Sequence, residues 1–364
     1  MNRRNALQTC LAAGASLVAS RALGSSAATV SDATRELVGS TITIDMHSHF
    51  SPDVTAADFA IKAGMEQAGL DAISASFPVD VIPWQAEGQW YTVFQAWVQN
   101  MKRLVKDAGI REICSLADLE ACHRDRVPGV LQSTEGAQFL EGRLERLGEA
   151  YDGGLRHLQL GHSVRDHFAP LGDLQTLEPK FDGLTPFGRS VIEECHRLGI
   201  VVDLAHSSGK TVRDALEVSS VPILFSHTAL LSPAGLGAVP TWPDTRLPMR
   251  LLRPDDAKAV ADAGGVIGVW HLFPTVTAYA AAIIDLVNTV GEDHVGIGSD
   301  TGVAGEMYNA NQRWPGQNTG FLFAVVEELR AQGCPPGAIR KVIGQNFCRI
   351  LHATEQGRTG SWVA

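Results

Sequence analysis

The chain has 364 residues, 45% of them hydrophobic, so it can bury a large core and does not have the composition of a disordered protein. Thirty Lys and Arg residues against forty Asp and Glu residues give a formal net charge of −10, which argues against a nucleic-acid-binding protein because such proteins cluster cations against phosphates. The six cysteines include no Cys-X-X-Cys pair and indicate neither a zinc ribbon nor a disulfide scaffold.

Residues 1–28 are expected to be a signal peptide. Arg3 and Arg4 form a basic start, residues 6–20 are uncharged and mostly apolar, and small residues end the segment. The adjacent arginines resemble a twin-arginine signal, which would export the folded protein to the bacterial periplasm. A general secretory signal and a retained amphipathic helix are the alternatives. The apolar run is too short to span a bilayer, and no later run is expected to be transmembrane.

Eight short runs rich in β-branched residues alternate with helical stretches in the remaining chain, 29–364, which is expected to form one domain. The runs are nearly continuous in apolar residues, as is typical of parallel strands buried on both faces. They comprise residues 41–45, 71–77, 130–134, 155–160, 200–204, 222–226, 266–270 and 294–299.

The stretches between these runs carry helix signals. Thr185 can cap a helix that begins at Pro186 and ends before Gly199. This alternation predicts an α/β fold, a (β/α)₈ TIM barrel, with a doubly wound open sheet as the alternative. No glycine-rich phosphate-binding motif follows any run, which weakens that alternative as a nucleotide-binding protein. Long loops are expected at 161–183 and 232–253.

Polar residues follow five of the runs, where a barrel would hold its functional residues. His47 and His49 alternate along the first strand, so they are expected to point the same way and could bind one ion. The other four runs lead to Glu135, His206, His227 and Asp300. Imidazole and carboxylate are the ligands that zinc and similar ions prefer. Each residue alone has an ordinary structural explanation, but together they predict a metal site.

The remaining polar residues near these runs are less informative. Asp45 and Asp203 either orient ligating imidazoles or cap loops, and the sequence leaves both explanations open. Structural roles are expected for the other histidines discussed here, His123, His157, His167, His196, His271 and His294.

These motifs resemble the membrane (renal-type) dipeptidase family, within the amidohydrolase-like metal-dependent hydrolases. The resemblance extends from about residue 40 to 355. It is strongest where Gly-Leu-Thr-Pro-Phe-Gly-Arg begins at residue 183 and Gly-Ile-Val-Val-Asp-Leu-Ala-His ends at residue 206. It continues in Pro-Ile-Leu-Phe-Ser-His (222–227), His-Val-Gly-Ile-Gly-Ser-Asp (294–300) and Ile-Gly-Gln-Asn-Phe-Cys-Arg (343–349).

The resemblance implies a barrel with two divalent metal ions, expected to be Zn²⁺. His47 and His49 would hold the first ion with Glu135, and Glu135 would bridge to a second ion held by His206 and His227. The two ions would together activate a water for attack on the amide bond of a dipeptide.

The resemblance also assigns the residues that act on the substrate. Asp300 would be the catalytic acid and base, and His162 would bind the substrate and polarise the scissile carbonyl. Arg250 is the first choice for the residue that binds the substrate carboxylate, and Arg246 and Arg253 compete with it. The partners implied are a small-molecule substrate, a dipeptide or similar amide, and a second copy in a homodimer.

Three features depart from the family pattern. The family has Asp where this chain has His49, the chain continues Thr301-Gly302 where the family usually has a second Asp, and the arginine is displaced by a longer insertion. Another small amide, an N-acyl amino acid or a lactone is therefore the alternative substrate. A non-catalytic metal-dependent periplasmic binding protein is the alternative of a different class.

Overall fold

The computed structural model describes residues 30–50, 55, 61–79, 82, 86–162, 171–237, 247–302, 314, 317 and 319–358. The expected signal peptide lies outside the described residues, as do His167 and Arg246.

A curled, all-parallel sheet forms the centre of the fold. Eight of its strands pair in chain order, and each of the eight predicted runs overlaps one of them. They are β1 (Ile44–His49), β2 (Ala72–Pro78), β4 (Gly129–Glu135), β5 (Leu155–Gln159), β6 (Val201–Asp203), β7 (Leu224–Thr228), β8 (Val266–Val269) and β9 (Val295–Ile297). The predicted α/β fold is therefore confirmed. The uninterrupted strand order excludes the doubly wound alternative, in which the order reverses.

Two further short strands complete the sheet. β10 (Thr301–Gly302) pairs with β1, and β1 also contacts β9 and β7, so the chain after the last long strand returns to the first. β3 (Arg111–Glu112) pairs with β4 and was not predicted, since it is only two charged, half-buried residues long.

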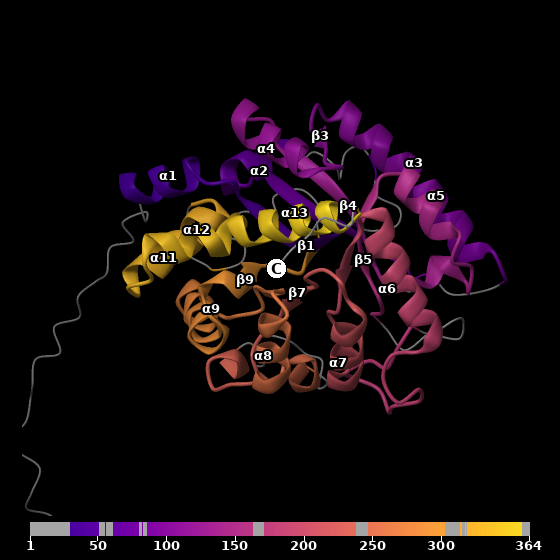
Figure 1. Cartoon of the computed structure of the whole chain (residues 1–364). Helices are drawn as coiled ribbons and strands as arrows, with labels where there is room; N and C mark the ends of the chain where they lie inside the picture. Colours follow the sequence, from indigo (N-terminus) through magenta and orange to yellow (C-terminus); the bar gives the residue numbers. More distant parts are fainter. Residues whose placement is uncertain are drawn as a thin grey trace, which may run out of the picture.

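Helices surround the strands, as Figure 1 shows. The longer ones are α1 (Asp32–Gly39), α2 (Lys62–Ala68), α3 (Gln89–Asp107), α4 (Leu116–Asp125), α5 (Arg146–Asp152), α6 (Pro186–Leu198), α7 (Gly209–Val218), α8 (Pro254–Asp262), α9 (Val276–Val290), α11 (Phe321–Ala331), α12 (Pro336–Arg340) and α13 (Asn346–Arg358). The predicted ends of α6 are confirmed. The side chain of Thr185 accepts a hydrogen bond from the backbone N–H of Gly188 at 3.0 Å, and Gly199 ends the helix with a left-handed φ of 82°.

The C-terminal motif 343–349 packs beneath the sheet. The Asn346 amide donates to the carbonyls of Glu292 and Val295, and Arg349 donates to the carbonyl of Gly264. These carbonyls lie at the amino ends of β8 and β9, and α13 contacts both strands. In Figure 1 α13 crosses the middle of the ring of helices. The motif therefore covers the amino ends of β8 and β9, opposite the edge of the sheet where a barrel would hold its site.

The described parts of the two long loops are also held in place. In the first loop, the Asp173 carboxylate accepts hydrogen bonds from the backbone N–H groups of Lys180, Phe181 and Gly183. The second loop contains a short 3₁₀ helix, η4 (Leu247–Arg250). None of the described helices combines the length and apolar character needed to cross a membrane.

Candidate metal centre

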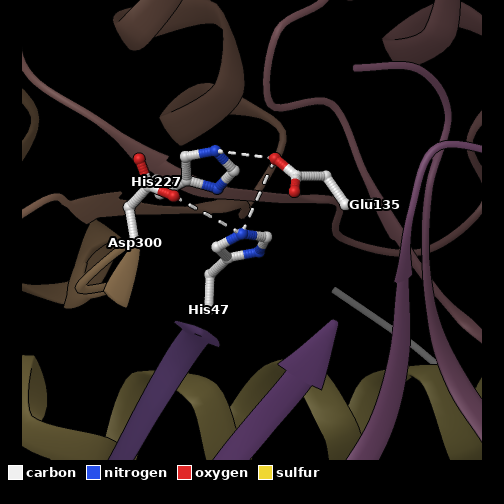
Figure 2. A group of neighbouring side chains, drawn as sticks. All are labelled: His47, Glu135, His227 and Asp300. Carbon is white, nitrogen blue, oxygen red and sulfur yellow. Dashed lines mark ion pairs between the residues drawn. The ribbon is translucent and has the colours of Figure 1, made fainter. Parts of the chain in front are cut away.

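Five residues predicted from the strand ends meet at the carboxyl edge of the sheet. His47 and His227 lie within β1 and β7, and Glu135 is the last residue of β4. His206 and Asp300 each follow a strand by three residues. Figure 2 shows four of these side chains pointing toward one another. Topology therefore gathers residues that are up to 253 positions apart in the sequence.

One carboxylate oxygen lies at the centre of the cluster. The Oε1 atom of Glu135 is 3.4 Å from Nε2 of His206, 3.5 Å from that of His162, 3.7 Å from that of His227 and 3.8 Å from that of His47. The potential ligand atoms form two groups, each within 4.8 Å. One contains His47, Glu135, His227 and Asp300, and the other contains Glu135, His162 and His206. Glu135 belongs to both groups, as expected of a carboxylate shared by two cations.

The protonation of His47 follows from its neighbours. Its Nδ1 lies 3.2 Å from the Oγ of Ser76, and that hydroxyl donates to Ser133 at 2.9 Å. Ser76 therefore accepts a hydrogen bond from His47, so Nδ1 carries the proton and Nε2 of the neutral ring carries a lone pair. This buried Nε2 makes no hydrogen bond among the described residues and lies 3.8 Å from the carboxylates of both Glu135 and Asp300. A lone pair facing two carboxylates is unfavourable unless a cation lies between them.

Burial keeps the imidazoles of His47, His206 and His227 neutral, which is the state that binds metal. It lowers the pKa of His47 to about 4, although the charges of Glu135 and Asp300 oppose this, and it lowers the pKa of His206 and His227 as well. Nε2 of His227 lies 2.9 Å from Nε2 of His206, and Nδ1 of His227 lies 2.8 Å from the Oγ of Ser226. Ser226 can orient His227 as Ser76 orients His47, with Nε2 directed into the site.

Two of the converging residues have strained backbones. His206 has a φ of 68° and Asp300 a φ of 53°, in the left-handed region that non-glycine residues rarely occupy. His206 lies in the turn after β6, and Asp300 lies between β9 and β10. Such strain persists only where the surrounding structure holds it, and it concentrates at functional sites.

His49 lies at the rim of the cluster instead of within it. Its side chain is 35% exposed, and its Nε2 is 3.7 Å from Oδ1 of Asp300. As alternation along the strand predicts, His47 and His49 point to the same side: the Nε2 atoms of both lie near Oδ1 of Asp300, at 3.8 and 3.7 Å, and their ring centroids are 6.2 Å apart. His49 nevertheless lies outside both groups of ligand atoms, and its role as a ligand stays a prediction.

The predicted substrate-binding residues lie around the same opening. His162 is half-buried, with its ring centroid 5.1 Å from that of His206. Arg250 is also half-buried, and its charge contributes to the lowered pKa of His206, so it lies near the site. Arg253 is exposed at the start of α8. The geometry thus favours Arg250 over Arg253.

Sequence reasoning missed the polar residues behind the cluster. Ser76 and Ser226 contact the Nδ1 atoms of two histidines. His157 and His271, which were expected to be structural, are buried and hydrogen-bonded. His157 contacts Asp203, and His271 contacts the carbonyl of Ser299. Serines within apolar strands are common, and only their spatial pairing with a histidine distinguishes these two.

Two comparisons of the sequence with known proteins point to the same family. The sequence model described as membrane dipeptidase (peptidase family M19) matches residues 62–361. Dipeptidase 3 from Mus musculus is 26% identical over 263 residues, which is 69% of this chain and 51% of that protein. The chain thus spans about half the length of this curated relative.

Solved structures share the fold. A probable dipeptidase, PvdM, from Pseudomonas aeruginosa superimposes with a TM-score of 0.74 and 17% identity, over 89% of this chain and 98% of that chain. A metallopeptidase from Rhodobacter sphaeroides, liganded with a phosphinate mimic of the dipeptide L-Ala-D-Ala, gives a TM-score of 0.67 and 19% identity, over 86% and 99% of the two chains. At such identities the likeness establishes a common fold.

Proposed function

Since the chain belongs to the membrane dipeptidase family, peptidase family M19, we propose that it is a hydrolase that uses two divalent metal ions to cleave the amide bond of dipeptides. The observation that carries this proposal is the buried Nε2 lone pair of His47, which faces the carboxylates of Glu135 and Asp300 without a hydrogen-bond partner among the described residues. We also infer that the curled sheet is the closed (β/α)₈ barrel expected from the sequence.

The residues present fit two ions. His47 and Glu135 would hold the first, joined by His49 if its side chain turns inward. Glu135, His206 and His227 would hold the second, because Nε2 of His227, although it belongs to the first group of ligand atoms, lies only 2.9 Å from Nε2 of His206. Nitrogen and carboxylate ligands of this kind suit Zn²⁺. Such ions act as Lewis acids that polarise a carbonyl and lower the pKa of water.

The remaining residues would manage the substrate and its proton. Asp300 is half-buried at the opening, so its carboxylate can take a proton from the attacking water and deliver it to the leaving amine. His162 can stabilise the oxyanion that forms from the scissile carbonyl. Arg250 would pair with the substrate carboxylate, because a guanidinium presents a fork of donors that matches it.

His49 sets the choice of substrate in this proposal. Its Nε2 lies 3.7 Å from Asp300, which belongs to the first group of ligand atoms, so a change of side-chain rotamer would bring it to the first ion. A neutral ligand in place of the family's aspartate leaves that ion with more positive charge. Other small amides, N-acyl amino acids and lactones are the alternative substrates.

We expect His49→Ala to weaken binding of one zinc ion by about 10–100-fold, the scale of a lost supporting ligand interaction. We expect His49→Asp to keep two ions and to increase hydrolysis of dipeptides relative to other amides. Zinc titration and a panel of dipeptides, N-acyl amino acids and lactones measure both effects. His352→Ala, which removes an exposed histidine from α13, is the matched control. Unchanged zinc affinity in His49→Ala would remove His49 from the site.

The panel also tests the alternative of a binding protein. Release of free amino acids that depends on added zinc is expected of the hydrolase. Saturable binding of a dipeptide to zinc-loaded protein, without turnover on any member of the panel, would favour the non-catalytic alternative.

We propose that the protein is exported to the periplasm by the twin-arginine route. Replacing Arg3 and Arg4 with Lys is expected to leave the precursor in the cytoplasm, because the paired arginines are the feature that this route recognises. Cell fractionation followed by immunoblotting measures the distribution. Undiminished export of the double variant would indicate the general secretory route instead.

A further inference from the structure

One buried carboxylate joins the two strand ends that carry His206 and His227. Asp203 is the last residue of β6 and is fully buried. Its Oδ1 accepts hydrogen bonds from the backbone N–H of Ala205 at 3.0 Å and from that of Ser226 at 2.9 Å. Those two amides belong to the residues directly before His206 and His227. A single oxygen atom therefore sets the spacing of the two backbone segments that present these histidines.

The other oxygen of Asp203 is fixed from the opposite side. Oδ2 lies 3.0 Å from Nε2 of His157, and Nδ1 of that ring lies 2.8 Å from the Oγ of Ser74. Burial by itself raises the pKa of Asp203, but the hydrogen bonds outweigh it and lower the pKa, so the carboxylate only accepts. His157 therefore donates from Nε2 and accepts from Ser74. All three side chains are fully buried, and a fully paired buried network of this kind holds one geometry.

A second buried carboxylate occupies the matching position in the other half of the site. Oδ1 of Asp45, in β1, accepts from the backbone N–H of Ser299 at 2.7 Å and from that of His47 at 3.3 Å, and its Oδ2 contacts the hydroxyl of Ser299. Ser299 directly precedes Asp300, whose own N–H donates to the carbonyl of His47 at 3.0 Å. Asp45 thus joins the strand ends that carry His47 and Asp300.

The strained residues coincide with these contacts. His206 and Asp300 are the two members of the cluster with positive φ, and each directly follows an amide that an aspartate holds. A conformation that is unfavourable for the residue itself must be maintained from outside. The two buried carboxylates supply that restraint, one in each half of the site.

We propose that Asp203 and Asp45 are positioning residues, each of which sets the geometry of one half of the metal site, so that the halves can be lost separately. Asp203 supports the ion held by His206 and His227, and Asp45 supports the ion held by His47. The inference rests on the proposed function in that it requires two ions. The sequence left open whether Asp203 orients a ligating imidazole or caps a loop. Here Asp203 holds the backbone before each ligand and not a ligand imidazole.

Zinc counting on the reconstituted full chain tests this proposal. Asp203→Ala and Asp45→Ala are each expected to lower the content from two ions to one, at a zinc concentration that saturates the wild type. Adding His206→Ala to Asp203→Ala should cause no further loss of zinc, because both changes affect the same ion. Adding His47→Ala to Asp203→Ala should remove the remaining ion. If Asp203 and Asp45 had a purely structural role, their replacement would lower the melting temperature without removing one particular ion in each variant.

Asp71→Ala is the matched control. Asp71 also joins backbone to a histidine, accepting from the N–H of Thr43 at 3.0 Å and lying 2.8 Å from Nδ1 of His123, but it does so at the amino ends of the strands. This variant should melt at a lower temperature and keep two ions. If Asp203→Ala does not fold, Asp203→Asn serves instead, because it keeps one acceptor oxygen. We expect it to lower the affinity for one zinc ion by about 10–100-fold and to leave the affinity for the other unchanged.

The outcomes separate the two proposals. Two ions in the wild type and two in folded Asp203→Ala would overturn the positioning role, as would loss of both ions together in Asp203→Ala. Fewer than two ions in the saturated wild type would overturn the binuclear site of the proposed function, whatever the variants show.

Discussion

Replacement of Glu135 with Gln is expected to release both metal ions and to abolish hydrolysis together. The Oε1 atom of Glu135 lies within 3.8 Å of four imidazole nitrogens and belongs to both groups of ligand atoms. A neutral amide of the same shape keeps the volume but removes the negative charge that two cations would share. The loss of activity should exceed the about 10–100-fold change typical of residues that only support a ligand.

Zinc analysis and hydrolysis assays on the same preparation measure this effect. Glu112→Gln is the matched control, because this half-buried glutamate of β3 accepts a hydrogen bond from Gln132 at 2.7 Å and pairs with Val130 near the amino end of β4, whereas Glu135 is at the carboxyl end. The control should keep two ions and full activity. Wild-type zinc content and turnover in Glu135→Gln would show that Glu135 is not the shared ligand.

The second large effect is expected for Asp300→Asn, which should lower kcat by about 10²–10⁴-fold, the scale of general acid–base catalysis. Both zinc ions should stay bound, because His47, Glu135, His206 and His227 are unchanged. Asparagine is the informative substitution here. Asp300 has a φ of 53°, and asparagine tolerates this region better than alanine does, so the backbone is preserved.

Steady-state kinetics on zinc-loaded Asp300→Asn separate the roles of this residue. A fall in kcat with nearly unchanged KM indicates lost proton transfer. A loss of zinc that accounts for the whole loss of activity would instead make Asp300 a metal ligand, and normal kcat would place the proton carrier at another residue.

The framework of the site could be predicted from the sequence. Parallel strands buried on both faces are recognisable as apolar runs, and the residue after each run lies at the edge where the strands end together. This reasoning led to His47, Glu135, His206, His227 and Asp300, which the fold brings together. It needs no knowledge of the loops, because the sheet alone determines where strand ends meet.

The details of the site could not be predicted, because they depend on contacts between strands. His49 lies at the rim with its side chain 35% exposed, and no local pattern in residues 44–49 signals this exposure. The pairing of Ser76 with His47, and of Asp203 with the amide of Ser226 before His227, joins residues on different strands. The position of Arg250 could not be predicted either, because it lies in an expected long loop whose sequence shows no helix or strand periodicity.

An anomalous-difference map of crystals grown with zinc, with data collected above the zinc absorption edge, tests the central claim most directly. We predict two peaks about 3.5–4 Å apart, as in other two-metal sites, with Glu135 between them, one against His47 and the other against His206 and His227. A single peak, or two peaks that do not share Glu135, would contradict the proposed binuclear site.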